Sequence, residues 1–515
     1  MLATSEARPQ RHRAAEESRG SAAAGSGCGR RGESPLRILR ALFAALGGLV
    51  VLAVAGTALF AALRLATHEP LLDRRHLDEK HRYLASLEAR ARPNLVLILF
   101  DDLGWGDLGA YGCRAIATPR IDRLAAEGAR LTDYHAPAPF CTPSRAGLLT
   151  GRYPPRTGLV QVTFPHGSPL DLLMRIAHLP TGMPEDEVLL PEVLRAAGYA
   201  TAMVGKWHLG GRSPSLPTEL GFDRYFGLLF SNDMAPVPLW RDREIAEPHP
   251  VDQSTLTERY TDEAIAFLEE NRGRPFFLYL AHTFPHVPLL PSAVQRGDSE
   301  GGIYGDVIED LDRSTGRLLD ALARLGLEDD TLVIVTSDNG PWFEGSPGSV
   351  RGRKNESFEG GTRVPFIARW PGRIPAGGVI GEPVNGIDVL PTMLGLTGIG
   401  PPPDRVLDGR DMWPVLAEGA RSPHEALYSY RGARLEAVRV GRYKAHSRHG
   451  VFGGSPGDLP FAGLFPKGPW LFDLDRDPSE SYDVSERQPE VAARLFALIE
   501  ARDAEMERNP RGWRE

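Results

Sequence analysis

Four apolar runs of strand length, separated by amphipathic helical stretches, constrain the fold of this chain more than any other feature. The runs are Asn94–Phe100, Tyr199–Gly205, Pro275–Ala281 and Thr331–Ser337. Between them, Thr257–Asn271 and Ile303–Leu325 repeat apolar residues at helical spacing. Strands that are apolar on both faces are typical of a parallel sheet covered by helices on each side. The pattern therefore predicts an α/β fold with a mostly parallel sheet flanked by helices.

The pattern changes after about Thr397, where a proline-rich linker is followed by short strand-like runs. These runs are Ala426–Tyr430, Ala437–Ala445 and Trp470–Leu474, and a helix-like stretch covers Pro489–Met506. With 515 residues the chain is also too long for one compact core. We therefore predict a large α/β domain over 93–397 and a small C-terminal α+β subdomain over 398–515, built as an antiparallel sheet plus one helix.

An unbroken apolar run, Ala41–Leu63, lies near the start of the chain. A helix of about 20 residues crosses the hydrocarbon core of a bilayer, so this run is long enough to span it. Arginines are denser before the run than after it, which places the N-terminus in the cytosol. We predict a transmembrane signal anchor at 41–63, a disordered basic head at 1–40 and a charged stalk at 64–92.

Two other interpretations of this apolar run remain. A cleaved signal peptide is the main alternative, although its apolar region is usually only about 7–15 residues long. A buried core helix is disfavoured because the run has no polar face. The anchor places the large domain in the secretory lumen, the periplasm or the cell exterior, and cleavage of the run would make the protein secreted.

Composition excludes several classes of protein. With 42% hydrophobic and 24% charged residues, the chain is not disordered as a whole. Its net charge of −8 disfavours a nucleic-acid-binding protein. Its three cysteines, Cys28, Cys113 and Cys141, cannot form a disulfide framework. A single Cys113–Cys141 bridge is conceivable, but the motif around Cys141 gives that residue another use.

Polar residues directly follow each of the four strand-like runs. They are Asp101 and Asp102, then Lys206 and His208, then His282 and His286, and finally Asp338 and Asn339. In an open parallel sheet, ligands bind beyond the carboxyl ends of the strands. We therefore expect these four stretches to meet at one site, although taken singly an Asp pair there is often only a turn or a helix cap.

The residue types at this predicted site indicate its chemistry. Three carboxylates and one amide oxygen are hard ligands, which suit Ca²⁺, with Mg²⁺ as the second choice. Positive charge comes from four further side chains: Lys206, His208, His286 and Lys354. A divalent cation beside such groups is typical of a site for a tetrahedral oxyanion, either a sulfate or a phosphate ester.

The motif Cys141-Thr-Pro-Ser-Arg145, followed by Ala-Gly-Leu-Leu-Thr-Gly-Arg152, provides a nucleophile. It resembles the signature of the sulfatase family, in which a separate formylglycine-generating enzyme oxidises the cysteine to Cα-formylglycine. The other motifs follow in the family's order over roughly residues 93–485. The resemblance is to arylsulfatase A-like enzymes, and it implies an alkaline-phosphatase-like fold.

The resemblance also implies a role for each matching residue. Ca²⁺ would be held by Asp101, Asp102, Asp338 and Asn339, together with an oxygen of modified Cys141. Arg145 would orient the formylglycine hydrate, and His208 would hydrogen-bond it. The sulfate oxygens would contact Lys206, Ser231, His286 and Lys354. His286 would also act as the general acid, whereas His282 has no firm role.

The mechanism implied by the resemblance avoids a stable thiosulfate ester. One hydroxyl of an aldehyde hydrate attacks sulfur, and deprotonation of the other then expels sulfate and restores the aldehyde. The substrate would be a sulfated small molecule, sugar or lipid, bounded by loops near 160–185, 211–250 and 446–468. Two alternatives stay open: a phosphonate monoester or phosphodiester hydrolase of the same fold, and a membrane-anchored binding protein with an unconverted Cys141.

Overall fold

The computed structural model describes residues 34–68, 71–447 and 468–514. The chain divides into two compact units, Met1–Leu63 and Arg64–Glu515. Helix α1 (Pro35–Ala66) contains a stretch, Leu42–Ala66, that is long and apolar enough to cross a membrane, and none of it is buried. Most of the predicted head lies outside the described residues, and its last residues, from Pro35 onward, belong to α1.

A ten-stranded sheet forms the centre of the unit Arg64–Glu515, in the order β11-β2-β10-β9-β1-β8-β4-β5-β6-β7. Its strands are β1 (Asn94–Phe100), β2 (Ala129–Leu131), β4 (Ala200–Gly205), β5 (Arg224–Gly227), β6 (Leu239–Arg241), β7 (Glu244–Glu247), β8 (Phe276–Ala281), β9 (Thr331–Ser337), β10 (Phe366–Arg369) and β11 (Gly378–Ile380). A separate two-stranded sheet pairs β3 (Tyr134–His135) with β12 (Val384–Asn385).

The four apolar runs of the sequence are the four adjacent strands β9, β1, β8 and β4. All of them are parallel to one another, and β5 continues the parallel set. Strand β10 pairs with β9 in the antiparallel direction, as β6 does with β5. The predicted mostly parallel sheet is therefore confirmed, with antiparallel pairings added toward both edges.

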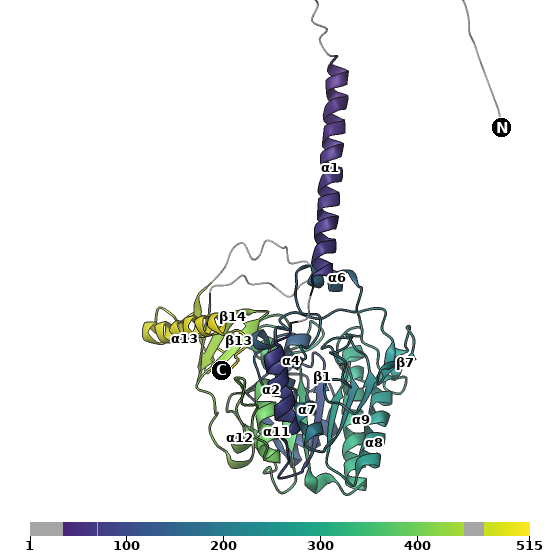
Figure 1. The fold of residues 1–515 in the computed structure, drawn as a ribbon. Helices are drawn as coiled ribbons and strands as arrows, with labels where there is room; N and C mark the ends of the chain where they lie inside the picture. The colour runs from purple at the N-terminus through teal and green to yellow at the C-terminus, as the bar shows by residue number, and fades with distance from the viewer. Residues whose placement is uncertain (1–33, 69–70, 448–467, 515) are drawn as a thin grey trace, which may run out of the picture. The chain divides into compact units, whose positions relative to one another are not determined.

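Helices cover both faces of this sheet, because its central strands are apolar on both sides. On β1, Leu95, Leu97 and Leu99 join one core cluster, while the alternate residues Val96 and Ile98 join the other. The first cluster is covered by α4 (Cys141–Thr150), α7 (Leu190–Ala196), α11 (Val389–Thr397) and α12 (Trp413–Glu418). The second is covered by α3 (Pro119–Glu127), α8 (Leu256–Asn271) and α9 (Gly302–Arg324), of which α8 and α9 run side by side in Figure 1.

Short helical segments complete the large domain. The α-helical ones are α5 (Pro154–Thr157), α6 (Pro169–Ile176) and α10 (Glu359–Thr362). The 3-10 turns are η1 (Gly109–Tyr111), η2 (Gln253–Thr255), η3 (Glu328–Asp330) and η4 (Gly386–Asp388).

The C-terminal region forms the predicted antiparallel sheet with one helix. Its strands are β13 (Leu427–Arg431), β14 (Arg434–Val440), β15 (Tyr443–His446) and β16 (Trp470–Asp473), and α13 (Pro489–Arg508) lies against β14 (Figure 1). One detail of the prediction was wrong, since Ala437–Ala445 is not a single strand. Gly441 adopts a left-handed φ of 56°, which turns the chain between β14 and β15.

The stretch 64–92, expected to form a stalk, contains a helix that packs on the large domain. Helix α2 (Arg74–Ala85) begins after Asp73, whose carboxylate accepts a hydrogen bond from the backbone N–H of His76. Its buried face includes Tyr83 and Lys80, and the ammonium of Lys80 lies 2.6 Å from a carboxylate oxygen of Glu192 on α7. The charges of this stretch therefore belong in part to a helix–helix interface.

Candidate active site

The predicted site residues lie where the parallel strands end. Asp101 follows β1, Lys206 follows β4, His286 comes after β8 and Asp338 follows β9, so the ends of four adjacent strands contribute. Gly205 makes this possible at β4: its φ is 110°, and a Cβ there would lie 1.8 Å from the carbonyl oxygen of Ala281. Only glycine allows the two strands to approach so closely at that turn.

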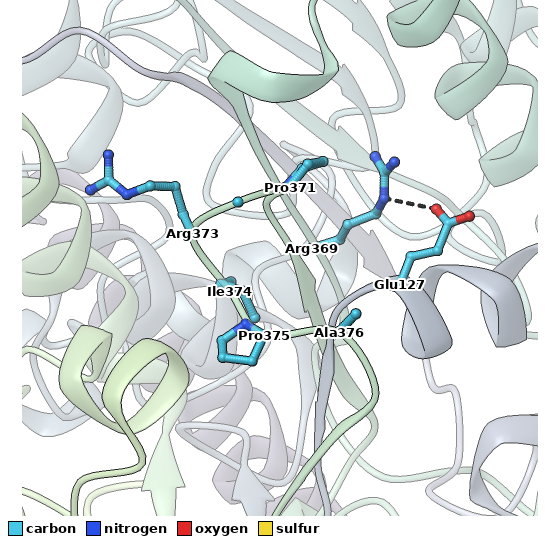
Figure 2. Close-up of a pocket in the computed structure, with 8 residues that line it drawn as sticks. Glu127, Arg369, Pro371, Arg373, Ile374, Pro375 and Ala376 are labelled. Carbon is cyan, nitrogen blue, oxygen red and sulfur yellow. Dashed lines mark ion pairs between the residues drawn. The ribbon is translucent and has the colours of Figure 1, made fainter.

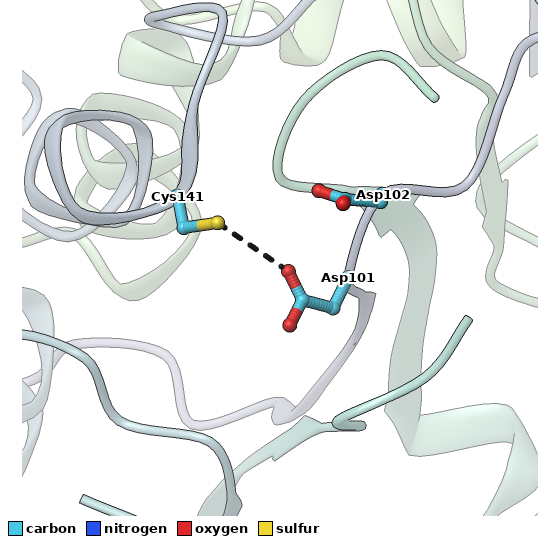
Figure 3. A group of neighbouring side chains, drawn as sticks. All are labelled: Asp101, Asp102 and Cys141. Carbon is cyan, nitrogen blue, oxygen red and sulfur yellow. Dashed lines mark hydrogen bonds between the residues drawn. The ribbon is translucent and has the colours of Figure 1, made fainter. Parts of the chain in front are cut away.

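Asp101, Asp102 and Cys141 form a compact buried group, shown in Figure 3. One potential ligand atom from each lies within 4.8 Å of the others, and the Cys141 Sγ is 3.6 Å from Asp101 Oδ1. Asp102 has a left-handed φ of 71°, and its N–H donates to Asp338 Oδ1 at 3.1 Å. Backbone strain of this kind costs about 1–3 kcal/mol and is concentrated at functional sites.

Asn339 adds an amide to the side chains of Asp101, Asp102 and Asp338. Its Nδ2 donates to Asp102 Oδ1 at 2.7 Å and to the carbonyl oxygen of Gly340 at 2.8 Å. Its Oδ1 is buried and accepts no hydrogen bond from the described residues. A buried acceptor without a donor, beside three carboxylates, fits a hard cation such as Ca²⁺.

Two lysines contact the carboxylates and the cysteine. The Lys206 ammonium lies 2.5 Å from Asp101 Oδ2 and 3.1 Å from Ser231 Oγ. The Lys354 ammonium lies 2.7 and 2.8 Å from the two oxygens of Asp102 and 3.2 Å from Cys141 Sγ. Both ammonium groups therefore lie in the same buried site as Cys141.

Arg145 links helix α4, which begins at Cys141, to two of the strand ends. Its Nε and Nη2 each lie 2.9 Å from Asp338 Oδ2, and its Nη1 donates to the carbonyl oxygen of Lys206 at 2.6 Å. When all three carboxylates are ionised, Arg145 and the two lysines offset them one for one. A divalent cation would make the site net positive, as an anionic substrate requires.

Burial and neighbouring charges shift the pKa values of the site carboxylates. Burial, with the neighbouring charge of Asp101, raises the pKa of Asp338 to about 7. Burial also favours the neutral form of Asp101, but Lys206, His286 and Arg145 outweigh it and hold that pKa well below its usual range. A bound cation would relieve the repulsion between these carboxylates.

Cys141 is the first residue of α4, and its environment disfavours the thiolate. Burial raises the pKa of the thiol to about 12, although Lys206 and Lys354 oppose this. The thiolate, not the thiol, is the reactive form of cysteine. At neutral pH the unmodified side chain is therefore a poor nucleophile despite its position at a helix N-terminus.

His208 is held in one tautomer by its surroundings. Its Nε2 lies 3.1 Å from the carbonyl oxygen of Thr163, so Nε2 carries the proton. Its Nδ1 is buried and has no hydrogen-bond partner among the described residues. Burial, with the charge of Lys206 added, holds the pKa of this ring well below its usual value. His208 therefore offers a free lone pair at Nδ1.

His286 is held in the other tautomer, with its proton on Nδ1 instead of Nε2. Its Nδ1 lies 3.1 Å from Asn232 Oδ1 and 2.6 Å from the carbonyl oxygen of Val287, so Nδ1 carries the proton. Its Nε2 lies 3.8 Å from Asp102 Oδ2, on the side of the carboxylates. Burial, followed by Lys354, lowers the pKa of the ring. Nε2 can donate a proton only when the ring is cationic.

Comparison with known proteins agrees with this geometry. Residues 93–399 match the family model described as Sulfatase, and residues 422–512 match the C-terminal region of aryl-sulfatase. The chain belongs to the sulfatase family. It is accordingly a sulfuric ester hydrolase, and its N-terminal apolar helix is outside both matched regions.

Individual sulfatases match over most of this chain. N-acetylgalactosamine-6-sulfatase of Sus scrofa is 40% identical over 453 residues, which cover 79% of this chain and 85% of that protein. Arylsulfatase A of Homo sapiens is 37% identical over 464 residues, which cover 80% and 88%. The crystal structure of the PsFucS1 sulfatase from Pseudoalteromonas sp. has a TM-score of 0.71 and 30% identity, covering 85% of this chain and 96% of that one.

His282, which had no firm role in the sequence, lies apart from this sulfatase's polar site. Its Nε2 is 3.2 Å from Ser314 Oγ on α9, and its ring packs near Phe100 and Tyr260. Burial lowers its pKa to about 3, so the ring is neutral. This histidine belongs to the helix-covered core.

Sequence reasoning missed three residues that position the two site histidines. Asn232 Oδ1 accepts a hydrogen bond from His286 Nδ1. The carbonyl oxygen of Thr163 accepts one from His208 Nε2. The hydroxyls of Thr142 and Thr163 donate to the backbone carbonyl oxygen of His208 at 2.8 and 3.2 Å. Asn232 directly follows Ser231 after a strand, so its position was a usable signal. Thr163 lies in an irregular loop, where no sequence pattern marks it.

Another hollow in the sulfatase, of about 510 Å³, is unrelated to this site. It is lined by Arg369, Arg373 and Glu127, and Arg369 is paired with Glu127 at 2.9 Å (Figure 2). Arg369 is level with Val333 near the beginning of β9, whereas the site residues follow the ends of the parallel strands. The hollow therefore lies near the N-terminal ends of the parallel strands, opposite to the site.

Proposed function

We propose that the chain hydrolyses sulfate esters with Cα-formylglycine, formed from Cys141, as nucleophile and with Ca²⁺ bound beside it. The main support is the position of Cys141. Its side chain starts α4, lies among Asp101, Asp102 and Lys354, and is a protonated and unreactive thiol unless modified. A cysteine so placed is well sited as a precursor but poorly suited as a nucleophile itself.

The residues that would hold Ca²⁺ are Asp101, Asp102, Asp338 and Asn339, with an oxygen of modified residue 141. Bound there, the metal would supply positive charge that favours deprotonation of a hydroxyl and stabilises the substrate oxyanion. Mg²⁺ is the second choice, because Ca²⁺ accepts more oxygen ligands in less regular geometry. The lysine contacts with Asp101 and Asp102 would then be redirected toward the sulfate oxygens.

The remaining side chains act on protons and on the sulfate group. Lys206, Ser231 and Lys354 would bind the sulfate oxygens and stabilise their charge. The lone pair of His208 Nδ1 would accept a proton from a hydroxyl at residue 141, because Nε2 donates its own proton to the carbonyl oxygen of Thr163. His286, held through Nδ1, would donate from Nε2 to the leaving alcohol once the substrate's negative charge favours its cationic form.

The test is mass spectrometry of the tryptic peptide 131–145 together with assays on paired sulfate and phosphonate esters. Protein produced with a formylglycine-generating enzyme should carry the aldehyde at residue 141 and prefer the sulfate ester. A preference for the phosphonate ester would favour the phosphonate monoester or phosphodiester hydrolase alternative. Full activity with only unmodified cysteine at residue 141 would refute the mechanism, and an unconverted, inactive protein would favour the binding-protein alternative.

We also propose that the stretch 41–63 anchors the enzyme in a membrane with its catalytic domain on the non-cytosolic side. The exposed apolar stretch Leu42–Ala66 and the arginines that precede it support this. Carbonate extraction of membranes followed by N-terminal sequencing tests the anchor. Soluble protein with a mature N-terminus beyond about residue 60 would show a cleaved signal peptide instead. The substrate would be a sulfated small molecule, sugar or lipid.

A further inference from the structure

Helix α6 turns an apolar face toward solvent. Leu170 is 49% exposed and Leu173 is 59% exposed, and as neighbours three residues apart they share one side of the helix. Asp171 and Met174 are buried on the other side. Apolar side chains gathered in this way usually mark an interaction surface.

Two further exposed leucines lie close to α6. Leu71 and Leu72 are each 38% exposed, and they line the same cavity as two residues of α6, Asp171 and Arg175. Among the described residues of the unit Arg64–Glu515, ten large apolar side chains are exposed, and four of them lie on α6 or line the cavity beside it. We call Leu71, Leu72, Leu170 and Leu173 the leucine surface.

The leucine surface lies where the chain leaves its long apolar stretch. Arg64 Nε donates to the carbonyl oxygen of Ile176, in the last turn of α6, at 2.8 Å. The Nε2 of His178, just after α6, lies 3.2 Å from the carbonyl oxygen of Arg64. Arg64 is covalently joined to Leu63, so α6 must lie near the membrane surface if residues 41–63 cross a bilayer, whatever the angle between the two units.

A cavity of about 300 Å³ lies behind α6. Three of its lining residues lie within two positions of residues already described at the site. Phe230 precedes Ser231, Phe164 follows Thr163, and Gly210 is two residues after His208. The Phe230 ring also stands edge-on to the His208 ring, with 6.4 Å between centroids. The volume of the cavity is at the lower end of the range for small-molecule sites.

We propose that the leucine surface rests in the interface of the bilayer that holds the anchor, and that the cavity behind α6 receives the organic part of an amphiphilic sulfate ester from that bilayer. Leucines inserted at the headgroup boundary are a common feature of helices that lie on membranes. Arg175 in the last turn of α6, and Arg64, which donates to the carbonyl oxygen of Ile176 there, are cations that suit contacts with lipid phosphates. The proposal rests on the sulfatase activity and on the membrane anchor proposed above.

The test uses the full chain with verified formylglycine, reconstituted in vesicles of phosphatidylcholine and phosphatidylglycerol. Two substrates are compared: a water-soluble aryl sulfate and the same aryl sulfate carrying a long alkyl chain. The double variant Leu170→Glu/Leu173→Glu should lose about tenfold in rate on the alkylated ester and keep its rate on the soluble one. The matched control is Val379→Glu, because Val379 is 60% exposed on the edge strand β11.

A second measurement covers the case in which the double variant folds poorly and loses both activities. A fluorophore placed at Leu173→Cys, in a Cys28→Ser/Cys113→Ser background, should be shielded from iodide in vesicles, whereas one at Val379→Cys should be quenched. Equal quenching at both positions, or equal rate losses on both substrates by a folded variant, would overturn the proposal.

The two supporting proposals fail in different and recognisable ways. An unmutated chain that carries formylglycine but does not hydrolyse the soluble ester would refute the sulfatase mechanism. Recovery of the chain outside the vesicle fraction would refute the anchor. Either result would remove the basis of the leucine-surface proposal as well.

Discussion

Replacing Lys354 by methionine should remove much of the transition-state stabilisation at this site. The ammonium of Lys354 lies 3.2 Å from Cys141 Sγ, so it is close to any anionic group bonded to a nucleophile at that position. Two unit charges at about 4 Å interact by about 4 kcal/mol at the effective dielectric constant of such sites. Lys206 remains and also stabilises charge on the sulfate oxygens, so we expect kcat/KM to fall by about 10²- to 10³-fold.

Lys354→Met should also change metal binding, because the ammonium contacts both oxygens of Asp102. Without it, a divalent cation would have one fewer competitor, so metal affinity should hold or increase while turnover falls. Activity, metal content and conversion of residue 141 must therefore be measured on the same protein sample. That combination separates a lost sulfate contact from a lost metal.

Lys80→Met is the matched control for this experiment. Lys80 is also buried and pairs with Glu192 at 2.6 Å, but it lies in the α2–α7 interface. Its replacement should lower the free energy of unfolding and leave the activity per folded molecule unchanged. If fully converted Lys354→Met retained kcat/KM within about threefold of the unmutated chain, the electrostatic argument would be wrong.

Three further predictions concern the nucleophile, the metal and stability. Cys141→Ala should abolish turnover, and Cys141→Ser should stop after at most one turnover per enzyme, because a single hydroxyl cannot expel sulfate; burst kinetics on an aryl sulfate check this, and sustained turnover by either variant would contradict it. Asp338→Ala should lose activity mainly through lost metal, which metal analysis checks against the unmutated chain; full occupancy together with full activity would reject the ligand assignment. Glu187 is buried, and Arg152, Arg511 and Arg405 outweigh that burial and lower its pKa to about 2 from 4.5, so it should contribute about 3 kcal/mol of stability above pH 4.5 that is lost as the pH falls toward 2. Urea unfolding should therefore show a gap between the unmutated chain and Glu187→Gln that narrows below pH 4.5, and a gap independent of pH would refute the assignment.

Much of the site was predictable because parallel strands impose a simple geometry. Residues that follow adjacent parallel strands are brought to one edge, so Asp101, Lys206, His286 and Asp338 meet whatever the details of the loops. The motif at Cys141 then added a candidate nucleophile, although the helix that begins there, α4, was not predicted. Asp101, Lys206 and Arg145 are fully buried, which the sequence did not indicate.

The tautomers of the two histidines depended on loop backbone. His208 is held by the carbonyl of Thr163, and His286 by Asn232 and the carbonyl of Val287. Carbonyl positions in irregular loops follow from how each loop packs, and residue type says little about them. The part of the expected rim between residues 448 and 467 lies outside the described residues.

The sequence by itself determined the class of fold and the enzyme family, because strand-length apolar runs and short motifs act through local periodicity and residue type. Only the tertiary structure decided that α2 packs on α7, that His282 belongs to the core, and that α6 with its exposed leucines lies beside Arg64. These outcomes depend on contacts between segments as much as 112 residues apart, as with Arg64 and Ile176. Such contacts are fixed by the packing of the whole domain, which no local pattern records.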